Sequence, residues 1–96
     1  MPIVSVTDSA TELFDAHPFT DGENDRYVSV HIENKSPNPV YIDTVSTVTA
    51  DEETTGGYEL AGSDATIEVT LQGNQKLYGI CATIHSPEKI AVLGPT

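Results

Sequence analysis

The chain has 96 residues, of which fifteen are acidic and four are basic, so its formal net charge is −11 at pH 7. A chain this short buries roughly 60–65% of the surface that its unfolded form exposes, and we expect one domain over residues 1–96. The negative charge repels phosphate groups and argues against nucleic acid and acidic membranes as partners. The single Cys81 excludes an internal disulfide and a zinc site built on several cysteines.

The first residues predict a short strand. Ile3, Val4 and Val6 are apolar, and the segment has neither the basic region nor the long apolar run of a signal peptide. No stretch of the chain reaches the length of a membrane span, so we expect a soluble protein. Residues 1–9 fit either an extended N-terminal arm or an edge strand of the domain.

Residues 11–14 fit either a strand or one helical turn, and residues 15–25 predict a polar loop because they hold Pro18, Gly22 and Asn24. Phe19 is isolated in that polar loop. An aromatic residue in this position either folds back onto the domain or anchors a protein interface.

Three acids stand at alternate positions of the same loop, namely Asp21, Glu23 and Asp25. Oxygen-rich loops of this kind can hold calcium, but the bidentate Glu that closes an EF-hand loop is missing, because position 32 is Ile. We therefore expect no metal and no cofactor, and keep the three acids only as a calcium candidate. The acidic runs 12–25 and 51–53 are either solvated surface or a patch that meets a basic partner.

The clearest strand signal follows this loop. Val28, Val30 and Ile32 alternate with polar residues, which is the period of a strand with one buried face and one solvent-exposed face. The two prolines in residues 34–39 interrupt the strand, and residues 40–42 restart an extended segment. The pattern predicts a unit like a β-hairpin, with a loop too long for a two-residue turn.

The remainder of the chain continues this alternation, and no segment has a sustained helical period. The further expected strands span residues 45–50, 58–60, 67–71, 77–83 and 90–93. About seven to eight short strands at close spacing predict an all-β protein, a small antiparallel β-sandwich or flattened barrel that is jelly-roll-like. We expect the two sheets to pack through Val28, Val30, Ile32, Ile67, Val69, Leu71, Leu77 and Ile80.

The residue types that carry chemistry do not form a recognisable catalytic set. Cys81 lies in an apolar run, where a thiol behaves as a small hydrophobe. His85 follows four residues later, but this Cys–His spacing alone is not specific for a catalytic site. No nucleophile elbow, phosphate-binding loop or dinucleotide fingerprint occurs. We therefore expect that the protein is not an enzyme. Tyr58, which follows two glycines, is a candidate for a contact surface.

Several short motifs occur in a fixed order along most of the chain. They are Val4–Thr7, Ala10–Thr11, Arg26–Asn34, Ser36–Ile42, Val48–Thr49, Gly57–Leu60, Ile67–Leu71, Leu77–Ile80 and Ile90–Leu93. In this order and spacing the chain resembles a group of small accessory structural proteins of tailed phages and related viruses. It departs from their pattern at Asp43–Ser46, where a glycine-bearing turn is expected, and at Ile84–Lys89, where a short Ser/Gly-rich turn is expected.

The resemblance implies a protein that is made in the host cytoplasm and assembles on the virion. Its most direct implication is a capsid decoration (cement) protein, which binds the outside of the assembled major capsid lattice and also binds itself, with a homotrimer as the expected form. A head–tail, neck, tail or baseplate accessory protein is the alternative, and a carbohydrate- or calcium-binding β-sandwich module is a further one. The candidate interface residues are Pro2, Ile3, Val4, Val6, Phe19 and Tyr58.

Overall fold

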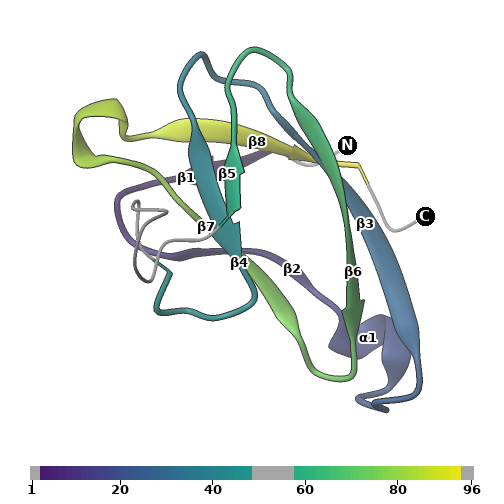
Figure 1. Ribbon diagram of the computed structural model, residues 1–96. Coiled ribbons are helices and arrows are strands. Elements are labelled where there is room, and N and C mark those ends of the chain that lie inside the picture. Colours follow the sequence, from purple (N-terminus) through teal and green to yellow (C-terminus); the bar gives the residue numbers. More distant parts are fainter. Residues whose placement is uncertain (1–2, 49–57, 94–96) are drawn as a thin grey trace.

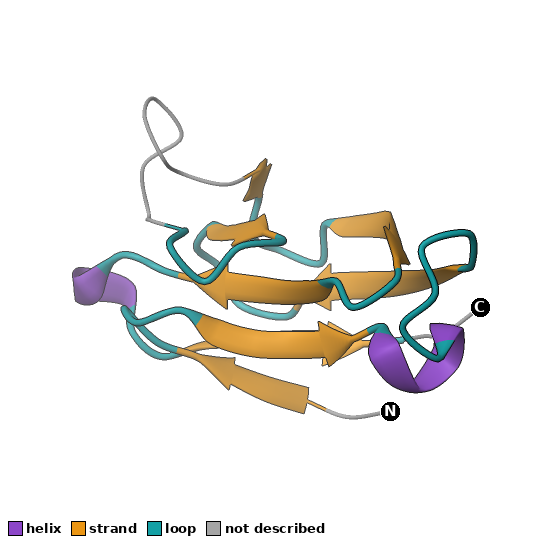
Figure 2. Ribbon diagram, turned by 90° about the horizontal axis from the view of Figure 1, so that it is seen from below, coloured by secondary structure: helices purple, strands orange, loops and turns teal. Residues whose placement is uncertain are grey.

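The computed structural model describes residues 3–48 and 58–93 (Figure 1). Within these residues the protein is nearly all β, with eight strands, one four-residue α-helix and one 3₁₀ turn. The strands are β1 (Ile3–Val6), β2 (Thr11–Asp15), β3 (Tyr27–Asn34), β4 (Val40–Asp43), β5 (Tyr58–Leu60), β6 (Thr66–Gln72), β7 (Lys76–Ile80) and β8 (Glu88–Val92). The helices are α1 (His17–Thr20) and η1 (Thr83–His85), which lie at opposite ends of the molecule (Figure 2).

The strands form two four-stranded antiparallel sheets that stack as two layers (Figure 2). Sheet A has the order β1-β8-β3-β6 and sheet B the order β2-β7-β4-β5. The first strand pairs with the last, the second with the seventh, the third with the sixth and the fourth with the fifth. This is the jelly-roll order, in which one long hairpin of strand pairs is rolled up into two sheets. The predicted all-β sandwich is confirmed.

The core lies between the two sheets and follows the predicted alternation. Val30 and Ile32 of β3 are completely buried, and the register pairs them with Val69 and Ile67 of β6. Of the eight residues expected to pack the sheets together, Val28, Val30, Ile32, Leu71 and Leu77 belong to the buried cluster. Ile67 and Val69 are only partly buried against that cluster, and Ile80 is buried but lies outside it.

The predicted hairpin of β3 and β4 is wrong, because these strands lie in different sheets. β3 pairs with β6 and β8, whereas β4 pairs with β5 and β7. Residues 35–39 carry the chain from one sheet to the other. Stacked sheets lie about 10 Å apart, a distance that a five-residue connection spans easily, so the prolines interrupt the strand without folding it back on itself.

The predicted strand over residues 45–50 is also wrong where the structure describes it. Residues 44–48 form bends and a turn, in which the Val48 N–H donates to the Val45 carbonyl oxygen at 3.4 Å. β4 ends at Asp43, whose Oδ1 accepts a hydrogen bond from the Thr44 N–H at 2.6 Å. A side chain that bonds the next backbone amide competes with ladder pairing, and this overrides the β-branched composition. Residues 49–50 lie outside the described part of the chain.

Three smaller differences concern element boundaries. Residues 11–14 form a strand, β2, which settles the choice left open by the sequence. The loop that follows contains α1, with Pro18 near its start, where the missing proline N–H is not needed. The predicted strand over residues 77–83 ends at Ile80, and η1 begins three residues later.

A buried asparagine at the end of β3 joins three segments of the chain. Asn34 is completely buried, and its Nδ2 donates to the carbonyl oxygens of Asn38 at 2.8 Å and Leu60 at 3.1 Å. Its Oδ1 accepts a hydrogen bond from the Ser36 N–H at 3.0 Å. One amide side chain thus satisfies the buried N–H of Ser36, the buried carbonyl of Leu60 and the half-buried carbonyl of Asn38.

The backbone beside Asn34 adds bonds to the connection between β5 and β6. The Asn34 N–H donates to the Ala65 carbonyl and the Asn34 carbonyl accepts from the Asp64 N–H, both at 2.9 Å. Gly62 lies against the Pro37 carbonyl group so closely that a Cβ at this position would collide with it. The β3–β4 and β5–β6 connections are therefore packed together as one unit.

We expect Asn34→Ala to lower the free energy of unfolding by about 3 kcal/mol, because one buried carbonyl, one half-buried carbonyl and one buried N–H would lose their partner. Chemical denaturation followed by circular dichroism measures this change. Asn24→Ala, at an exposed asparagine, is the control and should stay within about 0.5 kcal/mol of the wild type. Equal stability of the two variants would contradict the role assigned to Asn34.

Candidate binding groove

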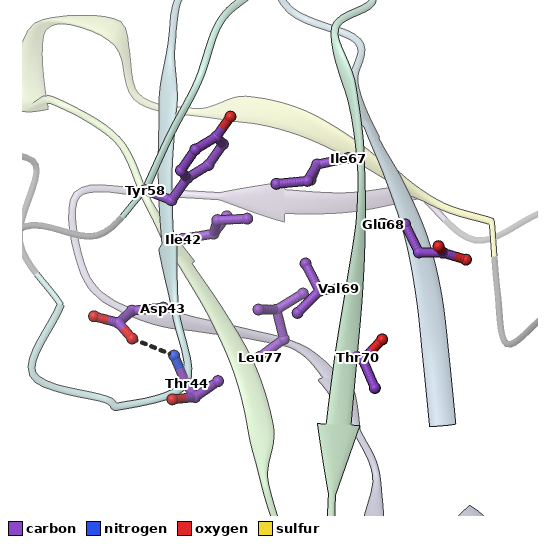
Figure 3. A pocket seen from close by; sticks show the side chains of 9 residues that line it. All are labelled: Ile42, Asp43, Thr44, Tyr58, Ile67, Glu68, Val69, Thr70 and Leu77. Carbon is purple, nitrogen blue, oxygen red and sulfur yellow. Dashed lines mark hydrogen bonds between the residues drawn. The ribbon is translucent and has the colours of Figure 1, made fainter. Parts of the chain in front are cut away.

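A groove lies between the β4–β5 side of sheet B and β6 of sheet A, with a volume of about 360 Å³ (Figure 3). This is near the lower end of the range for small-molecule pockets, roughly 300–1,000 Å³. Its lining is Ile42, Asp43, Thr44, Tyr58, Ile67, Glu68, Val69, Thr70 and Leu77. Ile42, Ile67 and Val69 point into the space between the strands (Figure 3).

The groove exists because the two sheets end in strands of unequal length. β6, the last strand of sheet A, has seven residues, whereas β5, the last strand of sheet B, has three. Leu71, on the inward face of β6, is completely buried, while Ile67 and Val69 on the same face remain partly exposed. The described residues of sheet B therefore cover these two aliphatic side chains only in part.

The polar residues of the groove stand at its margins. Glu68 and Thr70 alternate with the inward residues of β6 and so lie on the outer face of sheet A. The Glu68 side chain is 50% exposed, and its carboxylate lies 3.8 Å from His31 Nε2 on β3. Asp43 lies at the margin formed by β4. No lysine or arginine lines the groove, so its electrostatic potential is negative around an apolar floor.

The N-terminal interface candidates lie on β1, at the opposite edge of sheet A from the groove. β1 pairs with β8, so residues 3–6 form an edge strand of the domain. Val6 is completely buried, Val4 partly buried, and Ile3 is 52% exposed. Pro2 lies outside the described residues.

The other two interface candidates lie apart from β1 and from each other. Phe19, on α1, folds back so that its ring stacks on Phe14 of β2 with centroids 5.3 Å apart, and it keeps 48% of its surface exposed. Tyr58 begins β5, is 62% exposed and lines the groove. Of the interface candidates that the structure describes, Tyr58 is the one that lines this groove.

The three acids of the calcium candidate do not converge. The Arg26 guanidinium pairs with Asp21 at 3.1 Å and with Glu23 at 3.0 Å, so a cation from the chain itself already neutralises two of the three carboxylates. Among the described residues, no group of three or more His, Cys, Asp or Glu side chains is placed to hold a metal ion. The loop therefore offers an ion-paired surface in place of an ion-binding cage.

The buried reactive groups lie outside the groove. Burial, and next the negative charge of Glu88, raise the pKa of the Cys81 thiol, so this thiol is protonated and a poor nucleophile at neutral pH. Its Sγ donates to the Val6 carbonyl at 3.5 Å. Glu88 is itself buried; its Oε1 accepts from Asn38 Nδ2 at 3.2 Å, and its Oε2 has no hydrogen-bond partner among the described residues.

We expect native Cys81 to react with a disulfide reagent such as Ellman's reagent only as fast as the domain opens, because the thiol is 1% exposed and its pKa is raised. Absorbance of the released thiolate measures the rate, and the denatured protein is the control for full reactivity. Immediate labelling of the folded protein would contradict the burial of Cys81.

Comparison with protein-family models, curated proteins and solved structures found no match in any of the three. In the described part of the chain, no helix is long and apolar enough to cross a membrane. Function therefore has to be inferred from the residues and their arrangement.

Sequence reasoning placed Ile67 and Val69 in the core and did not identify the groove. The alternation along β6 gives the face of each residue correctly, but it carries no information about the strand that covers this face. The one available signal was the brevity of the predicted strand at residues 58–60, set against the longer strand that follows it. Asn34 and Glu88, both buried, gave no signal, because polar residues at strand ends are ordinarily exposed.

Proposed function

We propose that this protein is a non-enzymatic structural component of a virus particle, a capsid decoration protein that binds the outside of the assembled major capsid lattice. The observation that carries the proposal is a jelly-roll sandwich in which the described residues assemble a binding groove and no set of reactive groups. Jelly rolls are frequent among viral capsid proteins, and the motif order along the chain resembles that of small virion accessory proteins.

The surface chemistry supports a role in binding. The only nucleophile of high intrinsic reactivity, Cys81, is buried and protonated. The body is instead flattened, with principal extents of 38 × 28 × 17 Å, and it presents the apolar groove and the outer edges of four strands, β1, β2, β5 and β6. A thin plate of this kind presents much of its surface for contact relative to its mass.

The physical mechanism of decoration is linkage between binding and assembly. A protein that binds the assembled lattice, and not the dissociated subunits, stabilises the lattice by mass action. At a free concentration about 100 times the dissociation constant, this stabilisation reaches about 2.7 kcal/mol per site. No chemical step is needed, and a strong negative charge keeps unbound copies soluble.

The test mixes the purified protein with shells assembled from the major capsid protein encoded by the same genome. We expect saturable co-sedimentation at a fixed ratio to capsid subunits, and a higher melting temperature of the decorated shell by calorimetry. An unrelated acidic protein of similar net charge is the control. A genome without a capsid gene, or the absence of binding to intact shells, would overturn the proposal.

The number of copies per particle separates decoration from the neck, tail and baseplate alternatives. A decoration protein follows the capsid lattice and is present in many copies, whereas a neck or tail component is present in few. Quantitative mass spectrometry of purified particles measures the ratio to the major capsid protein. A ratio far below one copy per lattice position would assign the protein to the tail or neck instead.

We further propose that the protein assembles as a trimer through the outer edge of β1, where Ile3 is 52% exposed. Light scattering after size exclusion should give the mass of a trimer for the wild type and a lower mass for Ile3→Asp. Val45→Asp is the matched control, because Val45 is 48% exposed and lies between β4 and β5. A monomeric wild type, or equal effects of both substitutions, would contradict this assembly.

A carbohydrate-binding role is the second candidate, and one observation favours it. The Tyr58 ring lines the groove together with the polar residues Asp43 and Thr44. An aromatic face combined with a few polar groups is the usual chemistry of sugar sites, and jelly rolls are also common in lectins. Saturable binding on a glycan array, abolished in Tyr58→Ala, would favour this candidate over decoration.

A further inference from the structure

We propose that the groove between β5 and β6 receives an extended peptide segment of a partner protein, which adds as a strand beside β6. The segment has aliphatic residues at alternate positions and lysine or arginine between them. This inference deepens the proposed function by naming the contact chemistry, and its application to a viral shell rests on that function. The groove, the strand edge and the charge each support it separately.

The floor of the groove has the spacing of a strand. Ile67 and Val69 are two residues apart on the inward face of β6, and both keep part of their surface exposed. A strand that lies beside β6 also presents every second side chain to this face. Aliphatic side chains at two such positions would cover Ile67 and Val69 and complete the layer that the short β5 leaves open.

The backbone of β6 offers a pairing edge. β6 is the last strand of sheet A, and among the described strands only β3 pairs with it, over seven residues from Tyr27↔Gln72 to Glu33↔Thr66. The other edge carries a row of backbone donors and acceptors directed away from β3. The strand holds no proline, lysine or glycine, which are residues that block addition of a further strand.

The charge selects the chemistry of the partner. On the outer face, a strand beside β6 would place its intervening side chains next to Glu68, which is 50% exposed even though it lies near His31. Cross-strand pairs of opposite charge stabilise such an arrangement, and like charges oppose it. A second copy of this chain paired through its own β6 is a poor occupant, because it would bring a second Glu68 carboxylate to the same outer face. A basic and aliphatic strand of another protein meets both requirements.

A contact of this size is expected to be weak when it forms once. The contacts made by a small groove and one added strand must outweigh the translational, rotational and conformational entropy that the peptide loses on binding. We therefore expect a dissociation constant between about 10 µM and 1 mM for an isolated peptide. On a repeating lattice, several such contacts made by one trimer would act together and raise the overall affinity by about 100-fold or more.

The first experiment uses a short fluorescein-labelled peptide in which valine alternates with lysine and threonine. We expect saturable binding by fluorescence anisotropy that weakens with added salt, and slower hydrogen exchange of the β6 amides in the complex. Three control peptides should bind at least about tenfold more weakly. One replaces lysine with glutamate, one scrambles the alternation, and one has a proline at its centre.

The second experiment uses matched variants of the protein. Val69→Thr keeps the shape of the side chain but removes apolar surface from the groove, and it should weaken binding about fivefold or more. Thr66→Val makes the reverse exchange on the outer face of the same strand and should not weaken binding. Glu68→Gln should weaken binding of the lysine peptide, whereas Asp8→Asn changes the net charge equally at the β1–β2 connection and should have no effect.

Several results would overturn the inference. The first two are a lack of saturable peptide binding and equal binding of the glutamate and lysine peptides. The other two are unchanged hydrogen exchange of the β6 amides in the complex, and self-association of the protein that Val69→Thr abolishes. Displacement of the peptide by an oligosaccharide would assign the groove to sugar instead. If the protein binds the peptides but not capsid shells, the inference of a peptide-binding groove stands and the virion proposal fails. If Val69→Thr binds shells as well as the wild type, the groove inference fails and the virion proposal stands.

Discussion

The fold depends on the buried amide of Asn34, because this side chain fixes the relative position of the two sheets at one end of the sandwich. Sheet A contributes Asn34 itself, at the end of β3, and sheet B contributes Leu60, the last residue of β5, whose carbonyl accepts from the amide at 3.1 Å. The neighbouring backbone bonds hold the connection that leads into β6. The two walls of the groove, β5 and β6, are therefore positioned by one residue that does not line it. A buried polar network of this kind stabilises only when every member is satisfied, and it then specifies a single arrangement.

The alternation of aliphatic residues predicted the strands, because it depends only on neighbouring residues. Val28, Val30 and Ile32, and again Ile67, Val69 and Leu71, lie on the inward faces of β3 and β6 as expected. The sequence did not predict which strands pair, because a short connection is compatible both with a hairpin and with a crossing between sheets. The jelly-roll order is a property of the whole chain, and its pairs join strands as distant as β1 and β8.

The groove could not be predicted for a related reason. Whether Val69 is covered depends on the residues of sheet B that face it, and the alternation within β6 carries no information about those residues. The sequence makes Tyr58 a candidate contact residue from its place after two glycines, and in the structure Tyr58 lines the groove. Phe19 was left open between two outcomes, and stacking on Phe14 accounts for the half of its surface that is covered.

The distribution of charge opposes pairing of two copies at the open edge of β6. Three of the four basic residues, Arg26, Lys35 and Lys76, pair with carboxylates on the surface, and the hydrogen bond that Lys35 donates to Glu33 raises the pKa of Lys35. Such exposed pairs contribute little stability. However, they engage three of the four basic side chains that could otherwise attract the acidic surface of a second copy. An unprotected strand edge next to an apolar slot usually invites pairing between identical chains. Here self-pairing through β6 would bring the Glu68 carboxylates of two copies to one face, so local repulsion opposes that contact while the same charge attracts a basic strand. The acidic residues beside β6 and its unpaired edge are therefore related, because the negative charge opposes pairing between two such edges in solution.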